Sequence, residues 1–525
     1  MSIDPTSSAP ARAAELRSAG IKIGGALVVF GALYALYSHE VQVEAQVQEL
    51  LAGPKIAGGT RAGGARSDLN KDTPAGWLAG EKALEAALAL QPSNPFAVAA
   101  WADVEALLVS AGFDDRAAPA DEGLARAEAK DIAQPERYEA HALRLLQQGK
   151  AGEAENYLLA VLGRFGAVPR VIDALGLAQR ASGKLIEARQ SFRKAQDADW
   201  RSARKVANYA TALLEEGSAA EALAAYDRAL QANGDHLRSM LGKALAHAAL
   251  ARAGRNADLK AARALVDGVL SRGSDEVPPK LKARALAVRA EVRVAGGLAE
   301  DAPAAAQDSL EAEKLAPKEA QVLRALAYTA AARKADTYAA WKAATLADPY
   351  DASLYFDGVA ALSATSGEGG AEKLLGAYAA TLPKGARYHL ALARLLLAKD
   401  DPKAAEAELA RAQSLEPANP LVYFELGRAA QQRKDGKAAT AAYERAVQLR
   451  DDFPEVYRQM GALYLENKAV TEGLRAFTDA LARYKAARTP GPLMETFYEE
   501  VKTLVTKAGQ PKLARQWVEE ARAAH

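Results

Sequence analysis

The feature that most constrains this chain is a residue pattern that returns every 34 positions. Small and aromatic residues recur together at this spacing in Gly176/Ala210, Ala188/Ala222, Phe192/Tyr226 and Ala195/Ala229. The same frame returns near the C-terminus in Tyr423/Tyr457, Gly427/Gly461, Tyr443/Phe477 and Ala446/Ala480. A period of this length predicts stacked helix–turn–helix units, because a single unit cannot bury its own apolar face and must pack against its neighbours.

The two helices of each unit are expected to pack closely. In residues 169–202, Gly176 and Ala188 leave space between the helices, and Phe192 fills it. On these residues the unit resembles the tetratricopeptide repeat, which has small residues and an aromatic at these positions. The stretches that fit are 135–168, 169–202, 203–236, 386–419, 420–453 and 454–487. The resemblance implies an all-α fold, a right-handed superhelical solenoid of helix–turn–helix repeats.

Turn residues support the same frame. Gly149, Gly183 and Gly217 share one repeat position, where the first helix of a unit ends and a left-handed backbone is needed. The pattern continues less regularly elsewhere. We expect degenerate repeats over 74–134, divergent repeats over 237–385 and capping helices over 488–525.

Composition excludes several classes of function. Lys and Arg number 67 against 66 Asp and Glu, so no net field attracts the chain to nucleic acid. The chain has no cysteine, which rules out disulfides, thiolate metal ligands and thiol catalysis. A chain without thiols is compatible with an oxidising compartment outside the cytoplasm but does not prove that location.

The N-terminal segment reads as a membrane anchor. Residues 23–37 carry no charge, and Arg12, Arg17 and Lys22 precede them. Positive charges before an apolar stretch place the N-terminus in the cytoplasm. We therefore predict a cytoplasmic tail (1–22), a transmembrane signal anchor (23–38), and a short helix followed by a flexible Gly-rich tether (39–73). A cleaved signal peptide and a buried helix remain alternatives.

No pattern of catalytic or metal-binding residues is present. The six histidines are scattered, without the spacing of a metal site, and no nucleophile motif of the hydrolase type occurs. The sequence predicts a protein that is not an enzyme and has no cofactor, metal or catalytic site.

The resemblance also implies where partners bind. In the family, positions 2, 5, 9 and 12 of the first helix line the concave face of the solenoid. Carried over to the C-terminal repeats, this predicts a protein-binding groove formed by Arg387, Leu390, Arg394, Phe424, Arg428, Gln431 and Arg458. Guanidinium groups bind carboxylates through paired hydrogen bonds, so we expect an acidic and hydrophobic peptide or helix as the ligand. The alternative is that these arginines are solvated or pair with acids of the chain itself.

These observations predict a non-enzymatic scaffold anchored in the inner membrane, with its solenoid in the periplasm, that organises a multiprotein envelope assembly. Secretion, polysaccharide export, pili and motility are the processes considered. Two alternatives stay open, a periplasmic chaperone-like holder of secreted clients and a membrane-tethered regulator in the cytoplasm. Gly20 and Gly24 could pair two anchors, which leaves homo-oligomerisation open.

Overall fold

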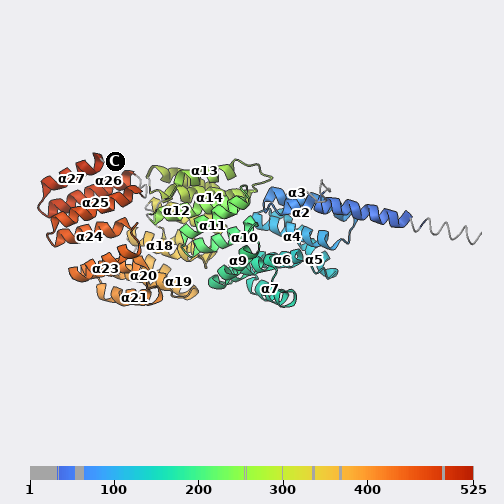
Figure 1. The fold of residues 1–525 in the computed structure, drawn as a ribbon, viewed down its shortest axis with the longest axis horizontal. Helices are drawn as coiled ribbons and strands as arrows, with labels where there is room; N and C mark the ends of the chain where they lie inside the picture. The colour runs from blue at the N-terminus through green and yellow to red at the C-terminus, as the bar shows by residue number, and fades with distance from the viewer. Residues whose placement is uncertain are drawn as a thin grey trace, which may run out of the picture. The chain divides into compact units, whose positions relative to one another are not determined.

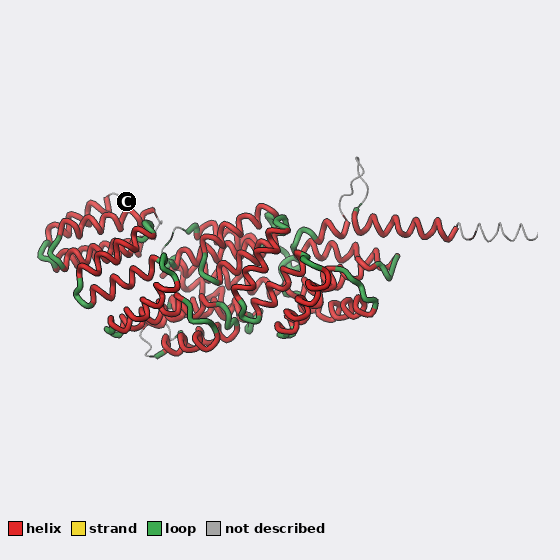
Figure 2. The backbone as a smooth tube through the Cα atoms, turned by 60° about the horizontal axis from the view of Figure 1, so that its bottom comes forward, coloured by secondary structure: helices red, strands yellow, loops and turns green. Residues whose placement is uncertain are grey.

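The structure, a computed structural model, describes residue 32 and residues 35–53, 64–253, 255, 257–297, 299–333, 337–365, 369–486 and 491–523. Within these residues every regular element is a helix and none is a strand (Figure 2). The predicted all-α class is therefore confirmed. The chain divides into two compact units. The first comprises residues up to 71, 75–107 and 116–140, and the second comprises 72–74, 108–115 and 141–525.

The first unit contains helical residues 35–52 and a group of further helices (Figure 1). Its elements, some of which cross the boundary, are α2 (Gly64–Leu69), α3 (Pro74–Leu90), α4 (Pro95–Ala111), η1 (Asp114–Arg116) and α5 (Ala117–Ala129). One correction concerns the predicted tether, since residues 64–69 form α2. Ala65 is fully buried there, and Leu69 packs against Gly80 of α3, so this Gly-rich stretch still offers one apolar face.

From α6 onward the helices pair into hairpins. The pairs are α6 (Pro135–Gln147) with α7 (Ala151–Phe165), α8 (Pro169–Ala181) with α9 (Leu185–Ala198), α10 (Ala203–Glu215) with α11 (Ala219–Ala232), α12 (Leu237–Arg252) with α13 (Leu259–Leu270), α14 (Pro279–Ala295) with α15 (Ala302–Leu315), α16 (Ala320–Ala332) with α17 (Tyr338–Ala347), α18 (Ala352–Thr365) with α19 (Gly370–Thr381), α20 (Ala386–Ala398) with α21 (Pro402–Leu415), α22 (Pro420–Gln432) with α23 (Gly436–Leu449), α24 (Pro454–Glu466) with α25 (Val470–Ala486), and α26 (Gly491–Lys507) with α27 (Pro511–Ala523). The short element η2 (Ala299–Asp301) precedes α15. The predicted 34-residue units thus correspond to hairpins.

The small and aromatic repeat positions meet inside each hairpin, as the sequence predicts. A Cβ atom on Gly176 would lie 2.6 Å from the ring of Phe192, and one on Gly461 would lie 2.6 Å from the ring of Phe477. Both aromatic rings are almost fully buried. The glycines are needed because the facing helix leaves no room for a side chain.

The turns between paired helices have a left-handed residue at one fixed repeat position. Gly149, Gly183 and Gly217 have φ angles of 76°, 79° and 90°. In the C-terminal repeats the same position holds exposed Asp400, Lys434 and Lys468, with φ angles of 60°, 62° and 63°. The predicted helix end is therefore confirmed, with glycine at this position over 135–236 and Asp or Lys over 386–487.

Residues about five 34-residue units apart touch within the second unit. Arg180 contacts Asp348, Arg284 contacts Ser110, and Arg387 contacts Glu216, at separations of 168, 174 and 171 residues. Contacts at this constant spacing mean that the stack of hairpins coils back on itself. We call the set of these contacts the seam.

The predicted membrane anchor and cytoplasmic tail lie almost wholly outside the described residues, which include only residue 32 and residues 35–38 of that part. Across the segments that are described, no helix is both long and apolar enough to cross a membrane. The exposed side chains of Leu36, Tyr37 and Val41 give the start of the helix over 35–52 an apolar surface.

Candidate protein-binding surface

The predicted groove residues lie on the first helices of three successive hairpins. Arg387, Leu390 and Arg394 are on α20, Phe424, Arg428 and Gln431 are on α22, and Arg458 is on α24. Successive first helices of such hairpins are neighbours, so all seven residues belong to one region of the second unit. The structure brings only some of them into one cluster.

The centre of the region is a cluster of two arginines on one carboxylate. Arg394 Nε donates to Glu425 Oε1 at 2.7 Å, and Arg428 Nη1 donates to Glu425 Oε2 at 2.8 Å. The Glu425 side chain is only 2% exposed, whereas those of Arg394 and Arg428 are 43% and 37% exposed. We call Arg394, Glu425 and Arg428 the arginine cluster. The cluster carries one surplus positive charge. The buried Glu425 carboxylate holds both guanidinium groups in place.

The other predicted arginines are engaged separately. Arg387 Nη1 donates to the backbone oxygen of Glu216 at 3.1 Å, and its guanidinium lies 4.5 Å from the ring centre of Phe356. Arg458 Nη1 lies 3.2 Å from Glu500 Oε2. Pairing with acids of the chain, the alternative reading, therefore describes Arg394, Arg428 and Arg458. It does not describe Arg387, which has a carbonyl and a ring as partners.

The remaining predicted residues divide between surface and core. Gln431 donates to Glu466 Oε1 at 3.0 Å and accepts from the hydroxyl of Tyr443 at 2.8 Å. Phe424 is half-buried, with its ring centre 5.1 Å from that of Phe453.

Leu390 does not line an open surface. It is 5% exposed, in a core cluster that includes Leu397 and Val422. Because the units stack, this position of α20 packs against the first helix of the next hairpin.

Glu425 is the member of the cluster that the repeat alignment did not select, because it falls one position after the expected lining position. The sequence does contain a signal for this ion pair, because Glu425 lies three residues before Arg428 on one helix. Residues at this spacing lie side by side on a helix surface and often form ion pairs.

The corresponding faces of the earlier repeats are filled with buried ions. Asp173 is fully buried and accepts from Asn208 at 3.0 Å, and Arg204 is 5% exposed with Asp72 and Asp173 nearby. Further along, Arg324 bridges Glu291 at 3.0 Å and Asp351 at 2.7 Å. These side chains form the interior of the coil and offer no exposed face to a partner.

Four of the six histidines are buried or contact side chains of the repeats. Burial lowers the pKa of His236 to about 4, against an opposing effect of Asp72, and Nδ1 of His236 lies 2.7 Å from the Ser239 hydroxyl. Burial also lowers the pKa of His247. His141 stacks on Tyr157, and His389 pairs with Glu408 at 2.6 Å. In the part of the chain that the structure covers, no three His, Asp or Glu residues are grouped to hold a metal ion.

Comparisons with known proteins add little. No protein-family model and no curated protein match the sequence. Among solved structures, a chain of the APC/C hetero-tetramer Cut9–Hcn1 matches over 82% of this chain and 93% of that chain, with 14% identity and a TM-score of 0.38. Yeast Tom70 matches over 74% of this chain and 96% of that chain, with 16% identity and a TM-score of 0.38. Values this low support no argument about function, so the assignment rests on the residues of this chain.

Proposed function

We propose that this protein is a non-enzymatic interaction scaffold whose C-terminal repeats bind an acidic segment of another protein. The observation that carries the proposal is the arginine cluster. Two arginine side chains, each more than one-third exposed, are paired with one buried carboxylate, and one positive charge is left over.

The chemistry favours a carboxylate ligand. Each guanidinium has five N–H donors, and Glu425 accepts one from each, which leaves donors for a second acceptor. Charge-assisted hydrogen bonds to carboxylates are about twice as strong as neutral ones. The fixed position of both groups also lowers the entropy that binding would cost. Half-buried Phe424 supplies an apolar contact beside them, which matches an acidic and hydrophobic ligand.

Single glutamine variants test this proposal. Arg394→Gln or Arg428→Gln leaves Glu425 one partner, so the fold is retained while the surplus charge is lost. We expect each variant to weaken binding of a fluorescent peptide of alternating Glu and Leu about tenfold, equivalent to about 1.4 kcal/mol. The matched control is Arg411→Gln on α21, where an arginine 64% exposed pairs with Glu408. Equal binding by Arg394→Gln, Arg428→Gln and Arg411→Gln would refute the assigned face.

The same variants can be used to identify partners in cells. Crosslinking and purification from native membranes should recover a few stoichiometric partners that Arg394→Gln and Arg428→Gln lose and Arg411→Gln keeps. A long list of weakly bound, unrelated clients would instead identify a chaperone-like holder.

We further propose that the chain is held in the inner membrane by residues 23–38, with the repeats in the periplasm, where they would organise an envelope assembly. The uncharged stretch over 23–37, with basic residues before it, supports this proposal. The absence of cysteine gives a direct test. Ser67 is exposed on α2, so Ser67→Cys should react with a membrane-impermeant maleimide in intact spheroplasts. Labelling only after lysis would place the repeats in the cytoplasm.

A further inference from the structure

The seam joins turns of the coil at three crossings, all within the second unit. At the first crossing, Gly112, Asp114 and Ser110 meet Lys280 and Arg284. The second crossing joins Arg180 and Gly183 to Asp348 and Tyr350, and the third joins Glu216 and Gly217 to Arg387. Each crossing sets a turn between helices against the start of a first helix five units further on.

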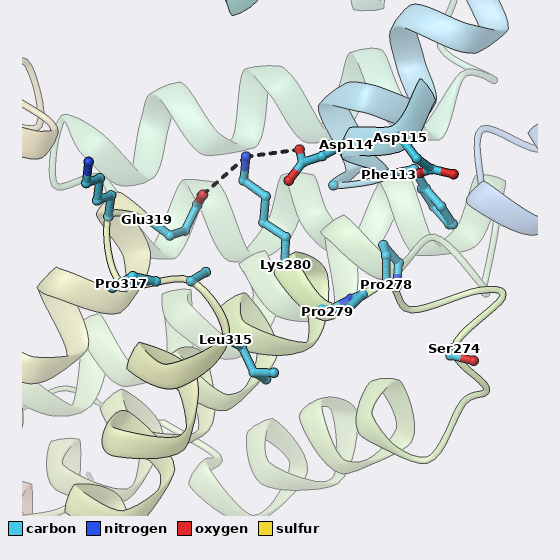
Figure 3. A pocket seen from close by; sticks show the side chains of 13 residues that line it. Phe113, Asp114, Asp115, Ser274, Pro278, Pro279, Lys280, Leu315, Pro317 and Glu319 are labelled. Carbon is cyan, nitrogen blue, oxygen red and sulfur yellow. Dashed lines mark ion pairs between the residues drawn. The ribbon is translucent and has the colours of Figure 1, made fainter. Parts of the chain in front are cut away.

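The first crossing has a longer ion pair than the second, although its backbones are close, since a Cβ atom on Gly112 would lie 2.9 Å from Lys280 Cβ. Lys280 Nζ reaches Asp114 Oδ1 at 3.6 Å and Glu319 Oε2 at 3.9 Å (Figure 3). Around this lysine lies a cavity of about 590 Å³, lined by Phe113, Pro278 and Pro317 among others. Ion pairs at such distances beside a cavity are readily screened by salt.

The second crossing combines a shorter ion pair with a contact to an aromatic ring. Arg180 lies between Glu215 and Asp348, with its Nη2 at 3.1 Å from Asp348 Oδ2. A Cβ atom on Gly183 would lie 2.5 Å from the ring of Tyr350. At the third crossing a Cβ on Gly217 would lie 3.0 Å from the Arg387 guanidinium.

The contacts of the seam restrict which residues can occupy the turn position shared by Gly149, Gly183 and Gly217. Gly149, Gly183 and Gly217 have the same left-handed conformation, but a Cβ on Gly149 would meet nothing within 4 Å. Lys434 and Lys468 occupy the same turn position in the C-terminal repeats, so the turn itself accepts lysine. At Gly183 and Gly217 a side chain is excluded by the facing turn of the coil as well.

We propose that the seam is a latch, and that the second unit converts between a closed coil and an opened coil with intact hairpins. Opening begins at the first crossing, where the ion pair between Lys280 and Asp114 is long and lies beside a cavity, and spreads toward the third. The hairpin interiors do not change, because their packing is local to each unit and its neighbours. Opening exposes the buried ionic faces of the central repeats, so the latch controls access to them. The inference is independent of the partner proposed for the arginine cluster.

Lysine substitutions at the same turn position in two different repeats test the latch, because one of the two turns lies at the seam and the other does not. Gly183→Lys adds a side chain against Tyr350, whereas Gly149→Lys adds the same side chain at the same backbone conformation into open space. Spin labels are attached to Ala181→Cys and Leu346→Cys in the full-length, cysteine-free chain, since both residues are exposed and flank the second crossing. Double electron–electron resonance then reports their separation.

We expect a short, narrow distance in the wild-type background and in Gly149→Lys at 0.1 M salt, and a longer, broader one in Gly183→Lys. The wild-type distribution should also lengthen at 1 M salt. A second variant, Lys280→Gln, changes a residue of α14 and no turn residue. The distance between the two labels should lengthen in this variant at a lower salt concentration than in wild type. Circular dichroism confirms that helix content is unchanged in each variant. Identical distances in Gly149→Lys, Gly183→Lys and Lys280→Gln at both salt concentrations would overturn the proposal.

Discussion

The repeats over 169–236 and those over 386–487 share one hairpin design but differ in what surrounds it. Both use a small residue facing an aromatic ring inside the hairpin, as in Gly176 with Phe192 and Gly461 with Phe477. In the earlier repeats the first-helix faces are buried, with Asp173 at 0% exposed. In the later ones Arg394 and Arg428 keep 43% and 37% of their side chains exposed. The 34-residue pattern therefore determines how each hairpin packs. The coiling of the stack determines whether the first-helix face of a hairpin is buried or exposed.

The largest expected effect comes from the buried ions of the central repeats. Glu291 is fully buried and pairs with Arg324 at 3.0 Å and with Arg252 at 3.8 Å. Glu291→Ala removes the carboxylate that both guanidinium groups share. Among the acids that the structure describes near them, Arg324 then keeps only Asp351 and Arg252 only Asp357, and the fully buried space of the Glu291 side chain is left empty. We expect a loss of about 3–5 kcal/mol in the free energy of unfolding, measured by urea denaturation.

The matched change in the later repeats is Glu425→Ala. Its two arginines are partly exposed, so water can solvate them once the carboxylate is gone. We expect a loss of about 1–2 kcal/mol. Equal losses for Glu291→Ala and Glu425→Ala would contradict the distinction between interior and available faces.

The second prediction concerns pH and compares two histidines. Burial lowers the pKa of His236 in the folded state to about 4, and the charged groups acting on it are Asp72, Arg204 and Arg238. Below the ordinary pKa of about 6.5 the unfolded chain takes up a proton that the folded chain refuses. Stability should therefore fall as the pH drops from about 6.5 toward 4, by about 3 kcal/mol for this group.

The measurement is the free energy of unfolding of wild type and His236→Gln between pH 4 and 7. The glutamine variant should show a shallower decline than wild type. His389→Gln serves as the comparison from the C-terminal repeats, where the ring pairs with Glu408. A decline of the same slope in wild type and His236→Gln would contradict the assignment.

A third prediction addresses what the two regions share. Gly176→Ala and Gly461→Ala each place a methyl group 2.6 Å from a buried ring. We expect both to lose about 1–3 kcal/mol of stability, because the ring must shift to admit the methyl group. Gly376→Ala on α19 is the control, since its Cβ meets nothing within 4 Å and alanine favours the helix by up to about 1 kcal/mol. A loss in one region alone would show that the hairpins are not equivalent.

The sequence allowed the hairpins to be predicted because their determinants are local. Gly176, Ala188 and Phe192 lie within one unit, and the 34-residue period reveals them. The seam could not be predicted this way, because Arg180 and Asp348 are 168 residues apart and no repeat position marks them as partners. The same holds for part of the proposed binding face. Arg394 and Arg428 were selected by repeat position, whereas Glu425, which holds both, was missed.

The smallest expected effect concerns the turn position itself. Lys434 has a φ of 62°, a conformation that costs a residue with a side chain about 1 kcal/mol relative to glycine. Lys434→Gly should therefore raise the free energy of unfolding by up to about 1 kcal/mol, partly offset by the greater entropy of glycine in the unfolded chain. The reverse change Gly149→Lys should lower stability by a similar amount, and Gly183→Lys should lower it further, because only Gly183 faces another turn of the coil. Thermal unfolding of the three variants measures the difference. If Gly149→Lys and Gly183→Lys lost the same amount, the turn conformation alone would explain the use of glycine in the earlier repeats, and the contact with Tyr350 would contribute nothing.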